Sequence, residues 1–206
     1  MKKKEILPNI YLVEFPTTIE AAMTFMRFQE HYESPKFRNK IFTREEYIKW
    51  YQEYTNKPNF TYYQDWSGFN IPSYVLLPFF SGAFSGLTHR ERTFLNLFRK
   101  CTGQYYIIGC KKGSKGTLKH ELMHGLYYTN NKYRRVVDKV LDDSHATFIM
   151  SSYLTKLGYH KEVLRDETHA YLVTCKEHLK KAKINIDLYK PYIKILNDNY
   201  RRHSKS

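Results

Sequence analysis

The 206-residue chain lacks several features that define whole classes of protein. It has only three cysteines, which are Cys101, Cys110 and Cys175. An odd set with no CxxC pair argues against a disulfide framework and against a cysteine-ligated zinc site. No apolar run is long enough for a membrane span. The apolar stretch that should follow the first lysines of a signal peptide is interrupted by Pro8, Asn9 and Glu14, so we expect a cytoplasmic protein.

The chain also lacks internal repeats, low-complexity linkers and sharp changes in composition. Its length suits one domain of ordinary size. We therefore expect a single domain over residues 1–206 with two halves of different character. Residues from about 1 to 113 mix helices with short strands, and residues from about 114 to 206 are almost all helical. This order predicts the α+β class, with a short mixed sheet in the N-terminal half.

In the N-terminal half, helical spacing, capping boxes and turn residues define the expected elements. The expected helices cover residues 18–32, 43 to about 54, and 88 to near 103, the last two opening on the capping boxes Thr43–Glu46 and Thr88–Glu91. The expected strands are Phe60–Tyr63, Tyr74–Leu77 and Gln104–Gly109, with a loop over Asp65–Pro72. In the C-terminal half, the expected helices cover residues 116–130, 133–141, 144–157 before Gly158, 166–183, and 188 onward.

One of these helices carries the sequence His120-Glu121-Leu122-Met123-His124. Side chains four residues apart lie on the same face of a helix, so the two imidazoles can meet at one point. Neutral imidazole is a preferred zinc ligand, and two histidines supply two corners of a tetrahedral site. Glu121 flanks that point without binding it, where it can take a proton from a water molecule that the metal activates.

The residues around this motif increase its specificity. They are uncharged where zinc peptidases of this kind have uncharged residues: Thr117, Leu118, Leu122, Met123, Gly125 and Leu126. On this helix the chain resembles the zincin metallopeptidases. The resemblance implies one Zn²⁺ ion, a peptide or protein substrate, and Glu121 as the general base.

A catalytic zinc usually has three protein ligands, so one ligand must come from elsewhere. The metzincin extension HExxHxxGxxH is absent, because Tyr127 and Asn130 occupy its Gly and His positions. A later glutamate completes the site in gluzincins, and Glu167 resembles that ligand, with the small Ala170 on the same helix face. The chain offers other candidates: Asp142, Asp143, His145, Glu162 and His169.

Further roles follow from the same resemblance. Tyr171, four residues after Glu167, is the preferred donor to the oxyanion, with Tyr127 and Tyr128 as alternatives. Zincins bind extended peptides along a strand edge, and the expected strand Gln104–Gly109 is the candidate edge.

The net charge of +14 leaves other partners open. Such a charge attracts nucleic acid, anionic surfaces or acidic proteins, although it says nothing about the fold. Two alternatives to a peptidase therefore remain. One is a basic nucleic-acid-associated protein with a zincin-type site, and the other is a non-catalytic module stabilised by its metal.

Overall fold

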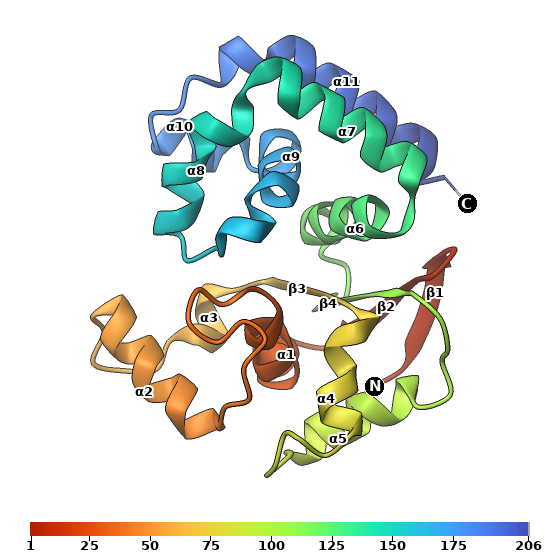
Figure 1. Ribbon diagram of the computed structural model, residues 1–206, viewed down its shortest axis with the longest axis vertical. Coiled ribbons are helices and arrows are strands. Elements are labelled where there is room, and N and C mark those ends of the chain that lie inside the picture. Colours follow the sequence, from red (N-terminus) through yellow and green to blue (C-terminus); the bar gives the residue numbers. More distant parts are fainter. Residues whose placement is uncertain (206) are drawn as a thin grey trace.

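A small sheet separates two groups of helices in the computed structural model, which describes residues 1–205 (Figure 1). Its strands are β1 (Lys3–Leu7), β2 (Ile10–Phe15), β3 (Gly68–Pro72) and β4 (Tyr106–Lys111), in the order β1-β2-β4-β3. β1 runs antiparallel to β2, β2 runs parallel to β4, and β3 runs antiparallel to β4. The expected α+β class with a mixed sheet in the N-terminal half is confirmed.

The strands contribute side chains to two hydrophobic cores, because successive side chains of a strand point to opposite faces of the sheet. Ile10, Leu12 and Tyr106 are buried in the core shared with the C-terminal helices. Val13 and Ile107 are buried in the core shared with the N-terminal helices. The sheet is therefore covered on both faces, and side chains from either half of the chain can approach it.

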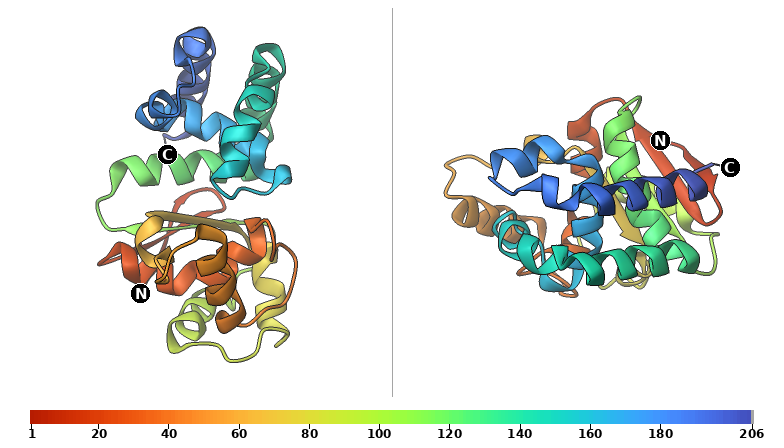
Figure 2. Two further views of the ribbon diagram at one scale, coloured as in Figure 1. Left: turned by 90° about the vertical axis from the view of Figure 1, so that its left-hand side faces the viewer. Right: turned by 90° about the horizontal axis from the view of Figure 1, so that it is seen from above.

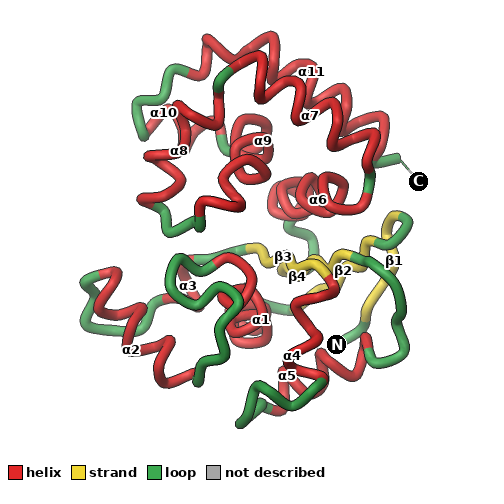
Figure 3. Tube along the Cα trace, viewed as in Figure 1, coloured by secondary structure: helices red, strands yellow, loops and turns green. Residues whose placement is uncertain are grey.

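The helices of the N-terminal half lie on one face of the sheet (Figures 1 and 3). They are α1 (Thr18–Glu33), α2 (Arg44–Thr55), α3 (Tyr62–Asp65), α4 (Leu77–Phe80) and α5 (His89–Phe98), with a 3-10 turn at Ser73–Leu76. Both expected capping boxes are present. Thr43 and Glu46 exchange hydrogen bonds between side chain and backbone at the start of α2, and Thr88 and Glu91 do the same at the start of α5.

The helices of the C-terminal half lie on the other face, with α6 directly on the sheet (Figure 2). They are α6 (Lys115–Thr129), α7 (Asn131–Ser144), α8 (Ala146–Lys156), α9 (Leu164–Thr174), α10 (Lys176–Lys181) and α11 (Lys190–His203), with 3-10 turns at Lys161–Val163 and Ile186–Tyr189. Gly125 allows α6 to lie this close, since a Cβ there would come within 3.1 Å of Ile10. Gly158 follows α8 with a φ of +99°, as expected of a helix stop.

Several expected elements of the N-terminal half are wrong. Residues 60–63 and 74–77 do not form strands but fall in or beside short helical turns. Their aromatic side chains pack against other aromatics instead, as Tyr62 does against Tyr51 at a centroid distance of 5.3 Å. The expected loop over residues 65–72 contains β3, whose Pro72 lies at the end of an edge strand, where proline is tolerated. The β1–β2 hairpin was not predicted.

Other differences concern element ends and the place of one strand. The helix expected over residues 166–183 is divided at Cys175 into α9 and α10. The helix expected to stop near Gly103 ends at Phe98. The strand expected over residues 104–109 is β4, which lies between β2 and β3 and is not an edge. Among residues 1–205, no helix combines the length and apolar character needed to cross a membrane.

Candidate metal centre

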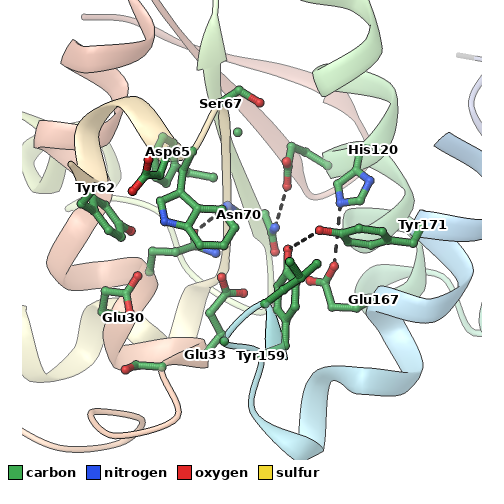
Figure 4. Close-up of a pocket in the computed structure, with 18 of the residues that line it drawn as sticks. Glu30, Glu33, Tyr62, Asp65, Ser67, Asn70, His120, Tyr159, Glu167 and Tyr171 are labelled. Carbon is green, nitrogen blue, oxygen red and sulfur yellow. Dashed lines mark hydrogen bonds and ion pairs between the residues drawn. The ribbon is translucent and has the colours of Figure 1, made fainter. Parts of the chain in front are cut away.

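Two helices bring three potential metal ligands together. His120 and His124 are one turn apart on α6, and their Nε2 atoms are separated by 3.2 Å. Glu167 on α9 lies 3.8 Å from His120 Nε2 through Oε2 and 3.6 Å from His124 Nε2 through Oε1. One ligand atom of each residue lies within 4.8 Å of the other two. Figure 4 shows His120 and Glu167 pointing toward each other.

The ring of His120 is oriented by Thr174 on α9. The Thr174 hydroxyl donates to the carbonyl of Ala170 at 2.7 Å, so its oxygen is left to accept a hydrogen bond. His120 Nδ1 lies 2.7 Å from that oxygen and is therefore the protonated nitrogen of a neutral ring. Nε2 then carries a free lone pair that faces the cluster. Thr174 was not predicted as a site residue.

Asp166 performs a similar role for His124. Its Oδ1 atom lies 3.0 Å from His124 Nδ1 and 3.4 Å from His169 Nδ1, although neither contact is well aligned as a hydrogen bond. A carboxylate at this distance favours the proton on Nδ1 and leaves Nε2 of His124 free to bind. Carboxylate–histidine pairs of this kind orient ligands in zinc sites. The acidic pair Asp166-Glu167 was the only signal in the sequence for this residue.

The electrostatics of the group favour a bound cation. Burial lowers the pKa of His124 to about 3 and also lowers the pKa of His120, so both rings are neutral. Burial raises the pKa of Glu167 well above its usual value, and its Oε2 atom has no hydrogen-bond partner among residues 1–205. Lone pairs that face each other in a buried site are unfavourable unless a positive charge lies between them.

The donor set and its spacing fit zinc. Ligand atoms at about 2.0–2.1 Å from a tetrahedral ion are roughly 3.3 Å from each other. The 3.2 Å between the histidine nitrogens matches this edge. The nearest oxygens of Glu167 lie slightly farther away, with Oε2 3.8 Å from His120 Nε2 and Oε1 3.6 Å from His124 Nε2. Two histidines and one glutamate could hold a zinc ion and would leave one position open, as in catalytic zinc sites.

Glu121 is held beside the group by a residue of the sheet. Its Oε2 atom accepts a hydrogen bond of 2.6 Å from Asn70 Nδ2, and Asn70 Oδ1 accepts one from the Tyr106 hydroxyl. Gly68 gives this carboxylate its space, because a Cβ there would lie 2.2 Å from Glu121 Oε1. Burial raises the pKa of Glu121 to about 8, against the hydrogen bond from Asn70, which lowers it. Asn70 and Gly68 were expected only as parts of a loop.

Tyr171 faces the same site. The edge of its ring meets the His120 ring at a centroid distance of 5.4 Å, and its hydroxyl lies 3.2 Å from that of Tyr159. Burial raises its pKa, so the phenol keeps its proton. The other candidate donors lie elsewhere: the Tyr127 hydroxyl donates to Asp138 at 2.8 Å, and Tyr128 packs on Tyr106.

The alternative third ligands lie outside the group. Asp142 pairs with Arg165 at 2.9 Å and its side chain is 67% exposed. Asp143 and His145 are exposed at the junction of α7 and α8. Glu162 pairs with Arg38 at 2.8 Å. His169 is fully buried behind His124, with ring centroids 6.0 Å apart, so it lies behind the cluster and not in it.

The site opens into a cleft of about 1010 Å³ between the two halves of the chain. One wall comes from α1 to β3, and the other from α6, α9 and the segment before α9. β3 is the edge strand at this cleft, but the backbone N–H of Asn70 already donates to Gln29 Oε1 at 2.9 Å. Strand addition to β3 is therefore restricted to the end near Gly68.

Comparisons of the chain with protein-family models, curated proteins and solved structures found no match.

Proposed function

We propose that this chain is a zinc-dependent peptidase with a gluzincin-type site. The observation that carries the proposal is the meeting of His120, His124 and Glu167 within 4.8 Å, with Glu121 next to them on α6. Zinc bound there would act as a Lewis acid that lowers the pKa of water and polarises a carbonyl group. The remaining chemistry belongs to the side chains of the protein.

Glu121 acts as the general base in this proposal. It takes a proton from the attacking water and later passes it to the leaving amine. A pKa of about 8 suits an acid–base group that must both accept and release a proton near neutral pH. Asn70 fixes the orientation of the carboxylate. Tyr171, which burial keeps protonated, donates to the oxyanion that forms from the scissile carbonyl.

The cleft supports a peptide as the substrate. Its volume of about 1010 Å³ lies at the upper end of the range for small-molecule sites. The site lies where the two halves of the chain face each other, and an extended chain could contact both walls. The backbone near Gly68 adds a short length of strand edge that can pair with such a chain.

Metal content and hydrolysis, measured together, test the proposal. Wild type should bind one zinc ion and cleave a mixed peptide library. Glu121→Gln should keep zinc and lose about 10²–10⁴-fold in rate, whereas His120→Ala and Glu167→Ala should lose zinc. Asp142→Ala is the matched control, because this exposed acid lies outside the group and should change neither quantity. Absence of zinc from wild type, or full zinc occupancy in Glu167→Ala, would overturn the assignment.

Chelation separates the peptidase from a module that only folds around its metal. A structural zinc contributes folding free energy directly, so its removal unfolds the domain. The chain has two hydrophobic cores that do not depend on the metal. We therefore expect the chelated protein to keep its circular dichroism spectrum and to lose only hydrolysis.

A further inference from the structure

We propose that the cleft contains an anionic subsite, centred on Glu33 with Glu30 beside it, that binds a cationic group of the substrate. The chemical class is an ammonium or a guanidinium. This inference rests on the proposed peptidase function and names its substrate class. It concerns the wall opposite the metal centre and not the metal ligands themselves.

The two carboxylates lie in the last turns of α1 and line the same cleft as His120, Glu121 and Glu167. Figure 4 shows Glu30 and Glu33 on one side, and His120 and Glu167 on the other. A substrate at the metal centre would therefore extend toward Glu33.

Neither carboxylate has a cationic partner among residues 1–205. The chain has 34 Lys and Arg residues against 20 Asp and Glu, yet within residues 1–205 no ion pair joins Glu30 or Glu33 to a Lys or Arg. Asp65, in the same cleft, does have one, with Lys57 Nζ at 3.0 Å. Glu30 is buried and Glu33 is half-buried. Carboxylates removed from water are normally paired, because an isolated buried charge is costly.

The surroundings of Glu30 and Glu33 increase the free-energy cost of keeping these carboxylates ionised. Burial raises the pKa of Glu33 to about 8, with a smaller contribution from the charges of Glu30 and Glu121 and against a hydrogen bond from Gln29, which lowers it. Burial raises the pKa of Glu30 to about 7, although hydrogen bonds from Tyr62 and Tyr47 oppose the shift. A bound cation would stabilise the ionised form of these groups.

Other features of the cleft also favour a cationic ligand. Glu167 of the metal centre lines the same cleft and is 3% exposed, and its Oε2 atom has no hydrogen-bond partner within residues 1–205. Aromatic rings line the cleft beside Glu30 and Glu33, and such rings attract cations through their faces. The rings are those of Tyr47, Trp50, Tyr51, Tyr54, Tyr62 and Trp66.

The lysines of the cleft do not neutralise the subsite. Lys57 pairs with Asp65. Lys119 Nζ donates to Asn197 at 3.1 Å and lies over the ring of Tyr200, on α11. Lys156 is exposed at the end of α8.

Fluorescence can test the subsite without any hydrolysis. Both tryptophans of the chain, Trp50 and Trp66, line the cleft, so their emission reports on its occupancy. N-acetyl-arginine amide and N-acetyl-citrulline amide differ in the charge of the side chain and have nearly the same shape. Wild type should bind the arginine compound at least about tenfold more tightly, as expected for a charge-assisted hydrogen bond.

Glu33→Gln should abolish this preference, so that both amides bind about equally. Glu45→Gln is the matched control, because Glu45 is an exposed glutamate of α2 outside the cleft lining and should leave the preference unchanged. Alaninamide, whose only charge is the α-ammonium, distinguishes the two sources of the cation. Tight binding of alaninamide identifies an N-terminal amine, and tight binding of the acetylated arginine identifies a basic side chain.

Any of three results would overturn the inference. Wild type could bind neither cationic compound, or it could bind both of them no more tightly than the citrulline amide. Alternatively, Glu33→Gln could keep the wild-type preference. A circular dichroism spectrum and a second variant, Glu33→Asp, guard against misfolding as the cause of a lost preference. Failure here is distinct from failure of the proposed function. If the protein cleaves peptides without regard to their charge, only the proposal of an anionic subsite is wrong. If it binds cationic amides selectively but neither binds zinc nor hydrolyses peptides, only the proposal of a peptidase is wrong.

Discussion

Two buried polar clusters lie on opposite faces of the sheet, and they differ in how completely their atoms are paired. On the N-terminal side, Arg27 of α1 and Glu91 of α5 form a bidentate pair with two contacts of 2.7 Å. The guanidinium also donates to the backbone carbonyls of Ser85 and Gly86. On the C-terminal side, the cluster around the candidate metal centre includes four buried atoms that make no well-aligned hydrogen bond within residues 1–205: His124 Nδ1, Asp166 Oδ1, Glu167 Oε2 and His169 Nε2.

The difference indicates what each cluster does. A buried ion pair in which every guanidinium nitrogen donates a hydrogen bond holds two helices together without a ligand. A buried group of lone pairs and carboxylates without partners is unfavourable by itself. Glu167 of this cluster lines the cleft, where a cation can reach it. Incomplete pairing beside a cleft is therefore the structural feature that distinguishes a candidate site from a structural ion pair in this molecule.

The largest expected effect is a loss of stability when the pair between Arg27 and Glu91 is broken. Arg27→Met leaves Glu91 buried without its partner, and removal of one partner of a buried pair typically costs about 3–5 kcal/mol of the free energy of unfolding. Chemical denaturation measures the loss, and zinc binding by the folded fraction should not change. Lys180→Met is the control, since its pair with Glu177 is exposed and should not affect stability measurably. An Arg27→Met variant as stable as wild type would contradict the comparison.

The cluster at the candidate metal centre should instead gain stability when zinc binds, because the ion would supply the partner that its ligand atoms lack. Zinc at about 1,000 times its dissociation constant should stabilise wild type by roughly 4 kcal/mol. His124→Ala should lose this gain, and Arg27→Met should keep it. Thermal unfolding with and without zinc measures both. A zinc-independent melting temperature in wild type would show that the cluster does not bind this ion.

Glu121 offers a test of geometry without a change in its chemistry. A Cβ at position 68 would lie 2.2 Å from Glu121 Oε1 and 2.5 Å from the Thr117 side chain. Gly68→Ala should displace the general base by about an ångström, which can cost about 100-fold in kcat, while zinc stays bound. Gly116→Ala is the control, because no heavy atom lies within 4 Å of a Cβ there. Equal rates for the two variants would argue against the placement of Glu121.

The smallest effect is expected from the residue that orients His124. Asp166→Asn keeps the shape of the side chain and removes its charge, and loss of such an orienting group typically lowers metal affinity by about ten- to 100-fold. Competition with a zinc chelator measures the affinity. Asp187→Asn, an exposed change near α11, is the control and should keep the wild-type affinity. Unchanged affinity in Asp166→Asn would mean that the 3.0 Å contact does not orient the ring.

The sequence predicted well what depends on neighbours within one or two turns. The capping boxes at Thr43 and Thr88 began their helices where expected, and Gly158 ended α8. His120 and His124 lie together because a helix brings residues four apart to one face. Short aromatic segments were predicted less well, because packing in the core overrides their preference for strands.

Contacts between distant segments required the tertiary structure. Asn70 meets Glu121 across 51 residues, and Thr174 meets His120 across 54. Glu167 was proposed from a resemblance and not from local pattern, and the packing of α9 on α6 brings it near both histidines. The sequence by itself therefore determined the helix that carries the motif, since its hydrogen bonds and caps are local. Only the tertiary structure decided which residues face that helix, because burial of two hydrophobic cores against one sheet sets the approach of α9 and β3.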